Sequence, residues 1–197
     1  MQPHCRSAHI GLAAAILLFC AAIAALLLRS HFEQRPVAFA EPGNPAPSFN
    51  LHDADGRFLS LDDLRGSAAV LYFTSIHCPN CAAYNPRIQA LANRYRSDPR
   101  VRFVAINIDP GTDPLQIRVD AKVVGRSFPT LIDDKTVTAT AYSITTTPQV
   151  AVIDPVGTLR YRGPFDDNAS ESKVTAQYVA DTLAGILAHP ELAFATK

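Results

Sequence analysis

An apolar run that leads into two closely spaced cysteines constrains this chain more than any other feature. Residues 68–73 are all apolar, Cys78 and Cys81 follow, and residues 82–91 form a helix-compatible stretch. A continuous apolar run is typical of a strand that is buried on both faces of a sheet. The pattern therefore predicts a buried strand, a turn that carries two thiols, and a helix, which together form a unit of an α/β fold.

The spacing of the two cysteines predicts redox chemistry. Two thiols three residues apart at a helix start can close into a disulfide and reopen. The unpaired N–H groups of the first turn and the positive end of the helix dipole favour the thiolate of Cys78, and the thiolate is the reactive form. His77 directly precedes it and is a candidate cation. Cys78 and Cys81 are thus the expected dithiol–disulfide centre.

Two other interpretations of the same pair are weaker. A zinc site needs two more ligands, and the other cysteines, Cys5 and Cys20, lie before and inside an apolar N-terminal segment. His52 and His77 remain candidate partners, but no second Cys or His pair has metal-ligand spacing. A purely structural pair of buried thiols is the second alternative. The strand-to-helix junction favours a redox motif, and we expect neither a metal nor another cofactor.

The charge balance argues against a nucleic-acid partner. The 197 residues contain 18 basic and 18 acidic side chains, and no basic block follows residue 40. Nucleic-acid binding proteins usually carry such a block or a basic face. The residues beyond position 40 are numerous enough for one domain with a sizeable core.

The N-terminal segment predicts a membrane anchor. Residues 10–28 are 19 consecutive apolar or glycine positions, which as a helix would nearly span a bilayer core of about 30 Å. A cleaved signal peptide is the alternative, with Ala38-Phe39-Ala40 as the cleavage motif, but that motif lies 12 residues past the apolar run. We expect an uncleaved signal-anchor, with the domain on the periplasmic or another extracytoplasmic side, where disulfides persist.

The predicted organisation follows from this segment. We expect an N-terminal flank (1–9), a transmembrane signal-anchor (10–28), a proline-rich tether (29–47), one domain (48–190) and a short tail (191–197). Strands are expected at 49–52, 57–61, 68–74, 101–108, 128–133, 149–154 and 158–162. Helices are expected from the CxxC motif to about residue 96, at 113–125, at 136–142 and at 172–189. Strands that alternate with helices predict an α/β three-layer sandwich.

Several separate stretches, in this order, resemble the redoxin branch of the thioredoxin-like superfamily. That branch contains peroxiredoxin-related proteins and membrane-anchored thiol–disulfide oxidoreductases. The resemblance covers residues 45–189 and is carried by 45–49, 61–66, 72–75, the CxxC motif, 128–133, Thr147-Pro148, 153–163 and 166–168. It implies a three-layer α/β/α sandwich with a redoxin-type N-terminal hairpin and a central insertion.

The resemblance also implies roles for individual residues. Cys78 would be the attacking thiolate and Cys81 the resolving thiol that releases the mixed disulfide. Pro79 suits the first helical turn, where its missing N–H would be unpaired. Thr147 and Pro148 would form a cis-proline loop beside the motif, and the backbone of Thr147 would pair with an extended substrate segment.

Some positions depart from the family pattern. Tyr72 stands where many thioredoxins carry a buried acid, and His77 stands where Trp is frequent. Ser75 matches the Ser or Thr that peroxiredoxins place three residues before their reactive cysteine, but Leu71 replaces the proline expected four positions earlier. Arg126 is a candidate anion-stabilising group, although a solvated surface arginine is the more common outcome for such a residue.

These observations predict a thiol–disulfide oxidoreductase that acts on protein thiols and disulfides of exported proteins and receives or passes electrons through an upstream redox partner. The main alternative is a thiol peroxidase that reduces hydroperoxides at Cys78. A third interpretation is a metal-binding thioredoxin-like module that uses the dithiol as its ligands.

Overall fold

The computed structural model describes residues 40–189. Within this range no helix is both long and apolar enough to cross a membrane. The predicted N-terminal flank at 1–9, the signal-anchor at 10–28, the start of the tether and the tail at 191–197 lie outside the described residues.

A seven-stranded mixed sheet forms the centre of the domain, in the order β2-β1-β5-β4-β3-β6-β7. Central strand β3 pairs in parallel with β4 and antiparallel with β6, so the strand that precedes the cysteines has neighbours on both sides. The strands are β1 (Asn50–Asp53), β2 (Phe58–Ser60), β3 (Ala68–Thr74), β4 (Val101–Asn107), β5 (Thr130–Ile132), β6 (Gln149–Ile153) and β7 (Leu159–Gly163).

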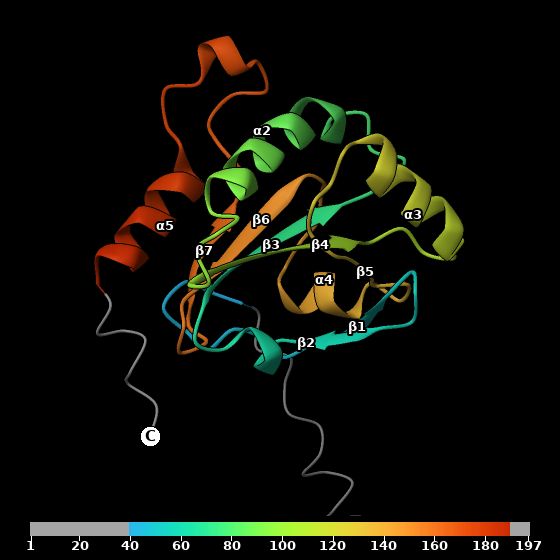
Figure 1. Ribbon diagram of the computed structural model, residues 1–197, viewed down its shortest axis with the longest axis horizontal. Coiled ribbons are helices and arrows are strands. Elements are labelled where there is room, and N and C mark those ends of the chain that lie inside the picture. The colour runs from blue at the N-terminus through green and yellow to red at the C-terminus, as the bar shows by residue number, and fades with distance from the viewer. Residues whose placement is uncertain (1–39, 190–197) are drawn as a thin grey trace, which may run out of the picture. The chain divides into compact units, whose positions relative to one another are not determined.

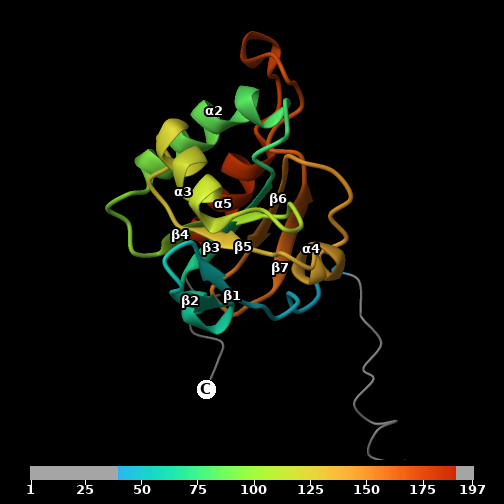
Figure 2. The ribbon, with the colours of Figure 1, turned by 90° about the vertical axis from the view of Figure 1, so that its right-hand side faces the viewer.

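Helices cover both faces of this sheet. Figure 1 shows α2 (Cys81–Arg94) and α5 (Tyr178–Ala188) on one side and α4 (Val137–Ala141) on the other, and Figure 2 shows the same layers after a quarter turn. Helix α3 (Pro114–Val123) lies between β4 and β5 in the chain. Two short 3-10 helices, η1 (Asp62–Leu64) and η2 (Glu171–Lys173), complete the described elements.

Strand β3 explains why both faces are covered. Every residue from Ala68 to Thr74 is buried, and successive side chains of a strand point to opposite faces. Val70 and Tyr72 pack in the core beneath α2 and α5. Leu71 and Phe73 pack in the core on the α4 side. A strand that is apolar at every position therefore needs a helical layer on each face.

The architecture is the predicted three-layer α/β/α sandwich. Strands β1 and β2 form the N-terminal hairpin, with Leu51 opposite Leu59. Helix α3 belongs to the predicted central insertion, and its cap is local, because the Asp113 side chain accepts a hydrogen bond from the Leu115 N–H. Asp and Asn are preferred at this position since they satisfy an otherwise unpaired donor of the first turn.

The prediction for the last helix is wrong at its start. The sequence pattern predicted a helix from residue 172, but α5 begins at Tyr178. Residues before it are tied to the loop after β7 instead: Asp167 accepts hydrogen bonds from both the backbone N–H and the hydroxyl of Thr175. The Asp167 N–H in turn donates to the carbonyl of Ala176. These bonds use backbone groups that a continuous helix would need.

Candidate active site

The two cysteines lie at the carboxyl end of β3, in and directly after the turn that leads into α2. The Cys78 N–H donates to the Ser75 carbonyl, and the Cys81 N–H donates to the Cys78 carbonyl, each at 3.2 Å. Asn80 already has helical dihedral angles, and α2 begins at Cys81. Cys78 and Pro79 therefore lie just before the helix rather than in its first turn, a difference of the size usual for helix ends.

The neighbouring strand holds this turn in place. The Ile76 N–H is shared between the side chain of Asn107, at 3.3 Å, and the carboxylate of Asp109, at 2.8 Å. Asn107 ends β4, which lies beside β3 in the sheet. The sequence analysis missed both residues, because the register between β3 and β4 is what brings them to the turn.

The supporting residues Ser75 and His77 take different positions. The Ser75 hydroxyl accepts a hydrogen bond from the His77 backbone N–H at 3.0 Å, so it stabilises the turn. The side chain of His77 is on an exposed residue. An exposed imidazole is well solvated, which weakens its electrostatic effect on the neighbouring thiol.

The two thiols differ in accessibility. Both are free; Cys78 is half-buried, and Cys81 is 2% exposed. The backbone N–H of Cys81 donates to the Cys78 sulfur at 3.2 Å, which is the contact that a thiol before a helix start is expected to receive. Burial raises the pKa of the Cys81 thiol, and its contact with Cys78 raises it further. An accessible sulfur thus lies beside a shielded one.

The loop before β6 completes the site. The Thr147–Pro148 peptide bond is cis, as predicted. The Cys78 thiol donates to the Thr147 carbonyl at 3.3 Å, so this loop lies against the accessible sulfur although 69 residues separate the two in the chain. The structure brings Thr147 and Cys78 together; a role of the loop in substrate binding stays a prediction.

A cleft of about 380 Å³ opens beside both sulfurs. It is bounded on one side by the start of α2 and on the other by the end of α3. Its lining includes Cys78, Cys81, Asn85, Asp120, Val123 and Val124. Sequence reasoning missed the α3 residues, because only the fold places that helix next to the motif.

Tyr72 lies at the strand position where many thioredoxins carry a buried acid. Tyr72 is fully buried, and its hydroxyl donates to Asn85 Oδ1 at 3.1 Å. Burial raises the pKa of Tyr72 above its ordinary value, so it stays neutral at physiological pH. The expectation that Arg126 is a solvated surface residue is wrong, because its side chain is 3% exposed.

No group of three or more His, Cys, Asp or Glu side chains that could hold a metal ion occurs within residues 40–189. His52, one of the candidate zinc partners, lies on β1, where its ring contacts Phe58 at a centroid distance of 5.7 Å.

A three-layer sandwich with a dithiol between its central strand and the following helix, facing a cis-proline loop, defines a thioredoxin-like protein. The model of the AhpC/TSA family matches residues 42–162, which is more than half of the chain. The chain belongs to this family, and the predicted redoxin relationship is confirmed.

Individual relatives agree with this placement. The thiol-disulfide oxidoreductase ResA of Bacillus subtilis (strain 168) is 30% identical over 117 residues, which cover 58% of this chain and 63% of that relative. The chain therefore matches less than two thirds of its length. A solved structure of an uncharacterized conserved protein from Geobacillus kaustophilus is 30% identical, with a TM-score of 0.69, and covers 77% of this chain and 84% of its own.

A second solved structure supports the fold alone. It is a putative thiol:disulfide interchange protein DsbE from Chlorobium tepidum, 24% identical, with a TM-score of 0.58 over 78% of this chain and 97% of its own. Of the relatives named above, ResA carries a name that agrees with the predicted class of enzyme, a thiol–disulfide oxidoreductase.

Proposed function

We propose that this protein is a thiol–disulfide oxidoreductase that exchanges disulfides with exported proteins through Cys78 and Cys81. The observation that carries the proposal is the pairing of an accessible sulfur with a buried one at the start of α2. Cys78 receives a backbone N–H and faces the Thr147 carbonyl, whereas Cys81 lies within reach behind it. This arrangement supports Cys78 as the attacking thiol and Cys81 as the resolving thiol.

The exchange proceeds in two steps. The Cys78 thiolate attacks a disulfide of the substrate, so that one substrate sulfur bonds to Cys78 and the other leaves as a thiolate. The Cys81 thiolate then attacks the Cys78 sulfur, the mixed disulfide breaks, and the second substrate sulfur leaves. Two electrons pass from the enzyme dithiol to the substrate, and the same steps in reverse oxidise a substrate dithiol.

The cis-proline loop is the proposed docking edge. Thr147 lies directly against the reactive sulfur, so a substrate segment that reaches Cys78 passes along this backbone. Pairing of an extended segment with such an edge supplies main-chain hydrogen bonds without demanding a particular sequence. Thr147 and Pro148 are therefore the proposed substrate-binding residues.

The proposed location is extracytoplasmic. Residues 10–28 would anchor the chain and residues 29–47 would act as a tether for the domain at 48–190, which faces the periplasm or an equivalent compartment. The long apolar run supports this proposal, and so does the chemistry, because such compartments permit disulfides to persist. An upstream redox partner would return the dithiol to its working state.

A trapping experiment tests the function. In a Cys81→Ser variant the mixed disulfide on Cys78 cannot be resolved, so exported proteins should accumulate as reducible adducts. The variant that carries both Cys78→Ser and Cys81→Ser is the matched control and should trap nothing. If the wild-type protein instead turns over hydrogen peroxide faster than protein disulfides and Cys81→Ser traps no protein, the peroxidase alternative replaces this proposal.

A further inference from the structure

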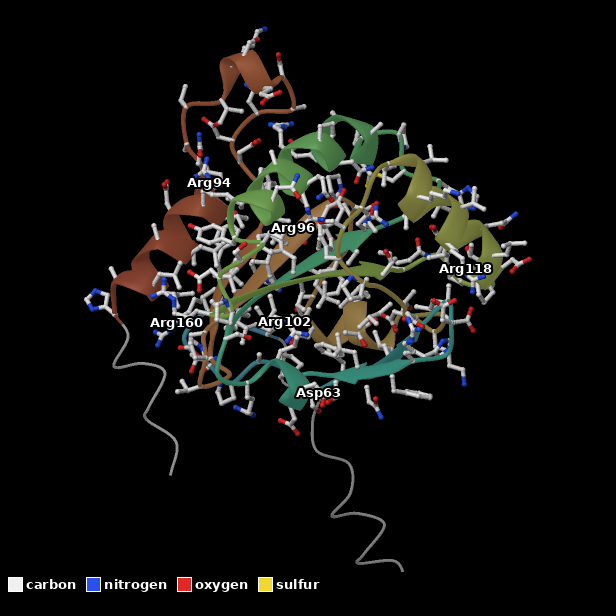
Figure 3. All side chains as sticks on the ribbon, in the orientation of Figure 1. Asp63, Arg94, Arg96, Arg102, Arg118 and Arg160 are labelled. Atoms are coloured by element: carbon white, nitrogen blue, oxygen red, sulfur yellow. The ribbon has the colours of Figure 1, made fainter. Side chains whose placement is uncertain are left out.

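Arg126, like Arg87 on α2, differs from the exposed arginines of the domain. Arg94, Arg118 and Arg160 belong to exposed positions, and Figure 3 shows them on separate elements around the periphery. The guanidinium of Arg126 is instead enclosed, with a side chain that is 3% exposed. Removing a cation from water is costly unless it is paired and hydrogen-bonded. Such a residue needs an explanation that a solvated arginine does not.

The neighbours of Arg126 belong to the redox cleft. Its guanidinium donates to the Thr130 hydroxyl at 3.0 Å and lies 3.5 Å from Asn85 Oδ1. It also lies 3.5 Å from the carboxylate of Asp120 and 6.0 Å from the centre of the Tyr72 ring. Asn85 and Asp120 line the cleft that both sulfurs share. The cation therefore lies directly behind the wall of that cleft.

Three titratable groups surround Arg126, each from a different segment. Asp120 comes from α3, Tyr72 from β3 and Cys81 from α2, and all three interact electrostatically with Arg126. Burial lowers the pKa of Arg126, and the charge of Asp120 opposes that change. An arginine remains protonated under these conditions, so the site keeps one fixed positive charge beside a buried thiol.

We propose that Arg126 is a positioning residue that stabilises the thiolate of Cys81 during resolution of the mixed disulfide. The inference rests on the proposed function and assigns a source of charge to its second step. In that step the Cys81 thiol loses its proton to water in the cleft, its sulfur bonds to the Cys78 sulfur, and the substrate sulfur leaves with the electron pair of the broken disulfide and takes up a proton.

The need for such a charge follows from the site itself. Burial disfavours the ionised form of Cys81, yet resolution requires that form. The strand position that could have offered a carboxylate as proton acceptor carries Tyr72, which stays neutral. A nearby cation in a poorly solvated environment favours an anion strongly, because the effective dielectric constant is low. The positive charge of Arg126 can therefore favour ionisation of Cys81, although no carboxylate at the position of Tyr72 accepts the proton.

Replacement of Asp120 tests the inference, because the two possible roles of its carboxylate predict opposite changes in the rate of resolution. Its carboxylate shares the cleft and partly neutralises Arg126. If the field of Arg126 controls Cys81, loss of the Asp120 charge should make the thiol more acidic and resolution faster. If Asp120 instead accepts the Cys81 proton, its loss should make resolution slower.

Stopped-flow reaction of the reduced protein with excess 5,5′-dithiobis(2-nitrobenzoate) separates the two steps. Attack of Cys78 releases the first chromophore at a rate that depends on reagent concentration, and attack of Cys81 releases the second at a rate that does not. In Arg126→Gln we expect the second phase to slow by about tenfold at neutral pH, with its pH midpoint raised, because a neighbouring charge commonly changes the ionised fraction by this factor. The first phase should be unchanged.

Matched variants distinguish charge from packing. Arg126→Lys keeps the charge and should restore most of the second-phase rate, and Asp120→Asn should lower the pH midpoint of that phase. The inference is overturned if Arg126→Gln leaves the second phase unchanged, slows both phases equally, or is not improved by Lys, or if Asp120→Asn slows the second phase. Failure of the proposed function would appear elsewhere, as absence of trapped proteins with Cys81→Ser in an otherwise intact Arg126 background.

Discussion

Asp166 is expected to be the residue outside the redox site whose charge matters most for stability. Its carboxylate pairs with the guanidinium of Arg87 on α2, and the two side chains are 4% and 7% exposed. The same guanidinium donates to the carbonyls of Asn168 and Ala169, each at 3.0 Å. One arginine thus fastens the loop after β7 onto α2. The sequence singled out 166–168 by family resemblance, and this contact gives that stretch a physical role.

The change Asp166→Asn removes the negative charge but keeps the size of the side chain. It leaves a guanidinium buried without its counter-charge, and breaking a buried pair in this way typically costs about 3–5 kcal/mol. Domains of this size have a free energy of unfolding of about 5–15 kcal/mol, so the loss is a large fraction. At about 2–4 °C per kcal/mol, the melting temperature should fall by roughly 6–20 °C.

Urea denaturation followed by circular dichroism measures this cost. Asp167→Asn is the matched control, because Asp167 binds Thr175 in the same loop on the exposed surface; we expect a clearly smaller loss of stability there, since water can solvate the groups that lose their partner. In a double-mutant cycle, Arg87→Met combined with Asp166→Leu should lose less than the sum of the single losses, since neither partner is then left charged and buried.

The reasoning is refuted if Asp166→Asn costs no more than Asp167→Asn. That result would mean that water reaches the guanidinium and screens it, in conflict with the burial of both side chains. A double variant whose loss equals the sum of the two single losses would also contradict the argument, because it would show that the two charges are not coupled.

Three further outcomes are expected. Alkylation of the reduced protein near pH 6, read by peptide mass spectrometry, should label Cys78 well before Cys81, because Cys81 is buried and its pKa is raised; the reverse order would exchange their roles. The raised pKa of Cys81 also predicts that the reduced protein loses stability as the pH rises above about 8.5, since the unfolded thiol ionises first, and urea midpoints for wild type and Cys81→Ala should converge there. Gly157→Ala should cost about 1–2 kcal/mol in urea denaturation. Gly157 has φ +90°, and Arg65 Nη1, which would lie 2.4 Å from the new Cβ, would have to move and give up its hydrogen bond to the Val156 carbonyl. Gly66→Ala, at φ +84° with no atom within 4 Å, carries only the backbone strain and should cost less.

Local patterns were sufficient to predict most of the sheet. The apolar run at 68–73 corresponds to β3, and the apolar stretch before the Asp154–Gly157 turn, with the strand predicted after that turn, corresponds to the β6–β7 hairpin. These patterns are reliable because the order of apolar and polar residues along a strand reflects directly whether one or both of its faces are buried. The class of fold then follows from the order of strands and helices, because short connections allow only a few arrangements of these elements in space.

The last helix shows where local patterns fail. Residues 172–177 contain nothing that forbids a helix, and the turn that replaces it depends on Asp167, which is eight residues from Thr175. A side chain that competes for backbone donors is a common reason for a helix to start late. The competition is decided by tertiary structure, because the loop after β7 must first be held against α2.

The candidate site divides in the same way. Cys78 and Cys81 could be identified from their spacing and from the run before them, and Pro148 from the family resemblance. Asn107 and Asp109 could not, since they reach the turn through the register of β4 against β3. A parallel neighbour strand always ends at the same edge as the strand it pairs with, so the residues after β4 were the place to look.

Arg126 is the most instructive error. In the sequence it directly follows Gly125, at the end of the predicted helix 113–125, and an arginine at such a position is usually solvated. The fold brings the end of α3 toward α2 and β5, and the arginine is enclosed between Asn85, Thr130 and Asp120. The presence of Tyr72 at the position of the acid and the burial of Arg126 both concern the charge that is available near Cys81. In the proposed mechanism, Arg126 provides an internal cation at a site that has no internal base beneath its resolving thiol. An internal cation and an internal base predict opposite effects when the neighbouring carboxylate is removed. Where a buried acid accepts the proton of the resolving thiol, loss of that acid should slow resolution, because the proton acceptor disappears. Here loss of Asp120 should speed it, because the carboxylate only weakens the field of Arg126 at Cys81.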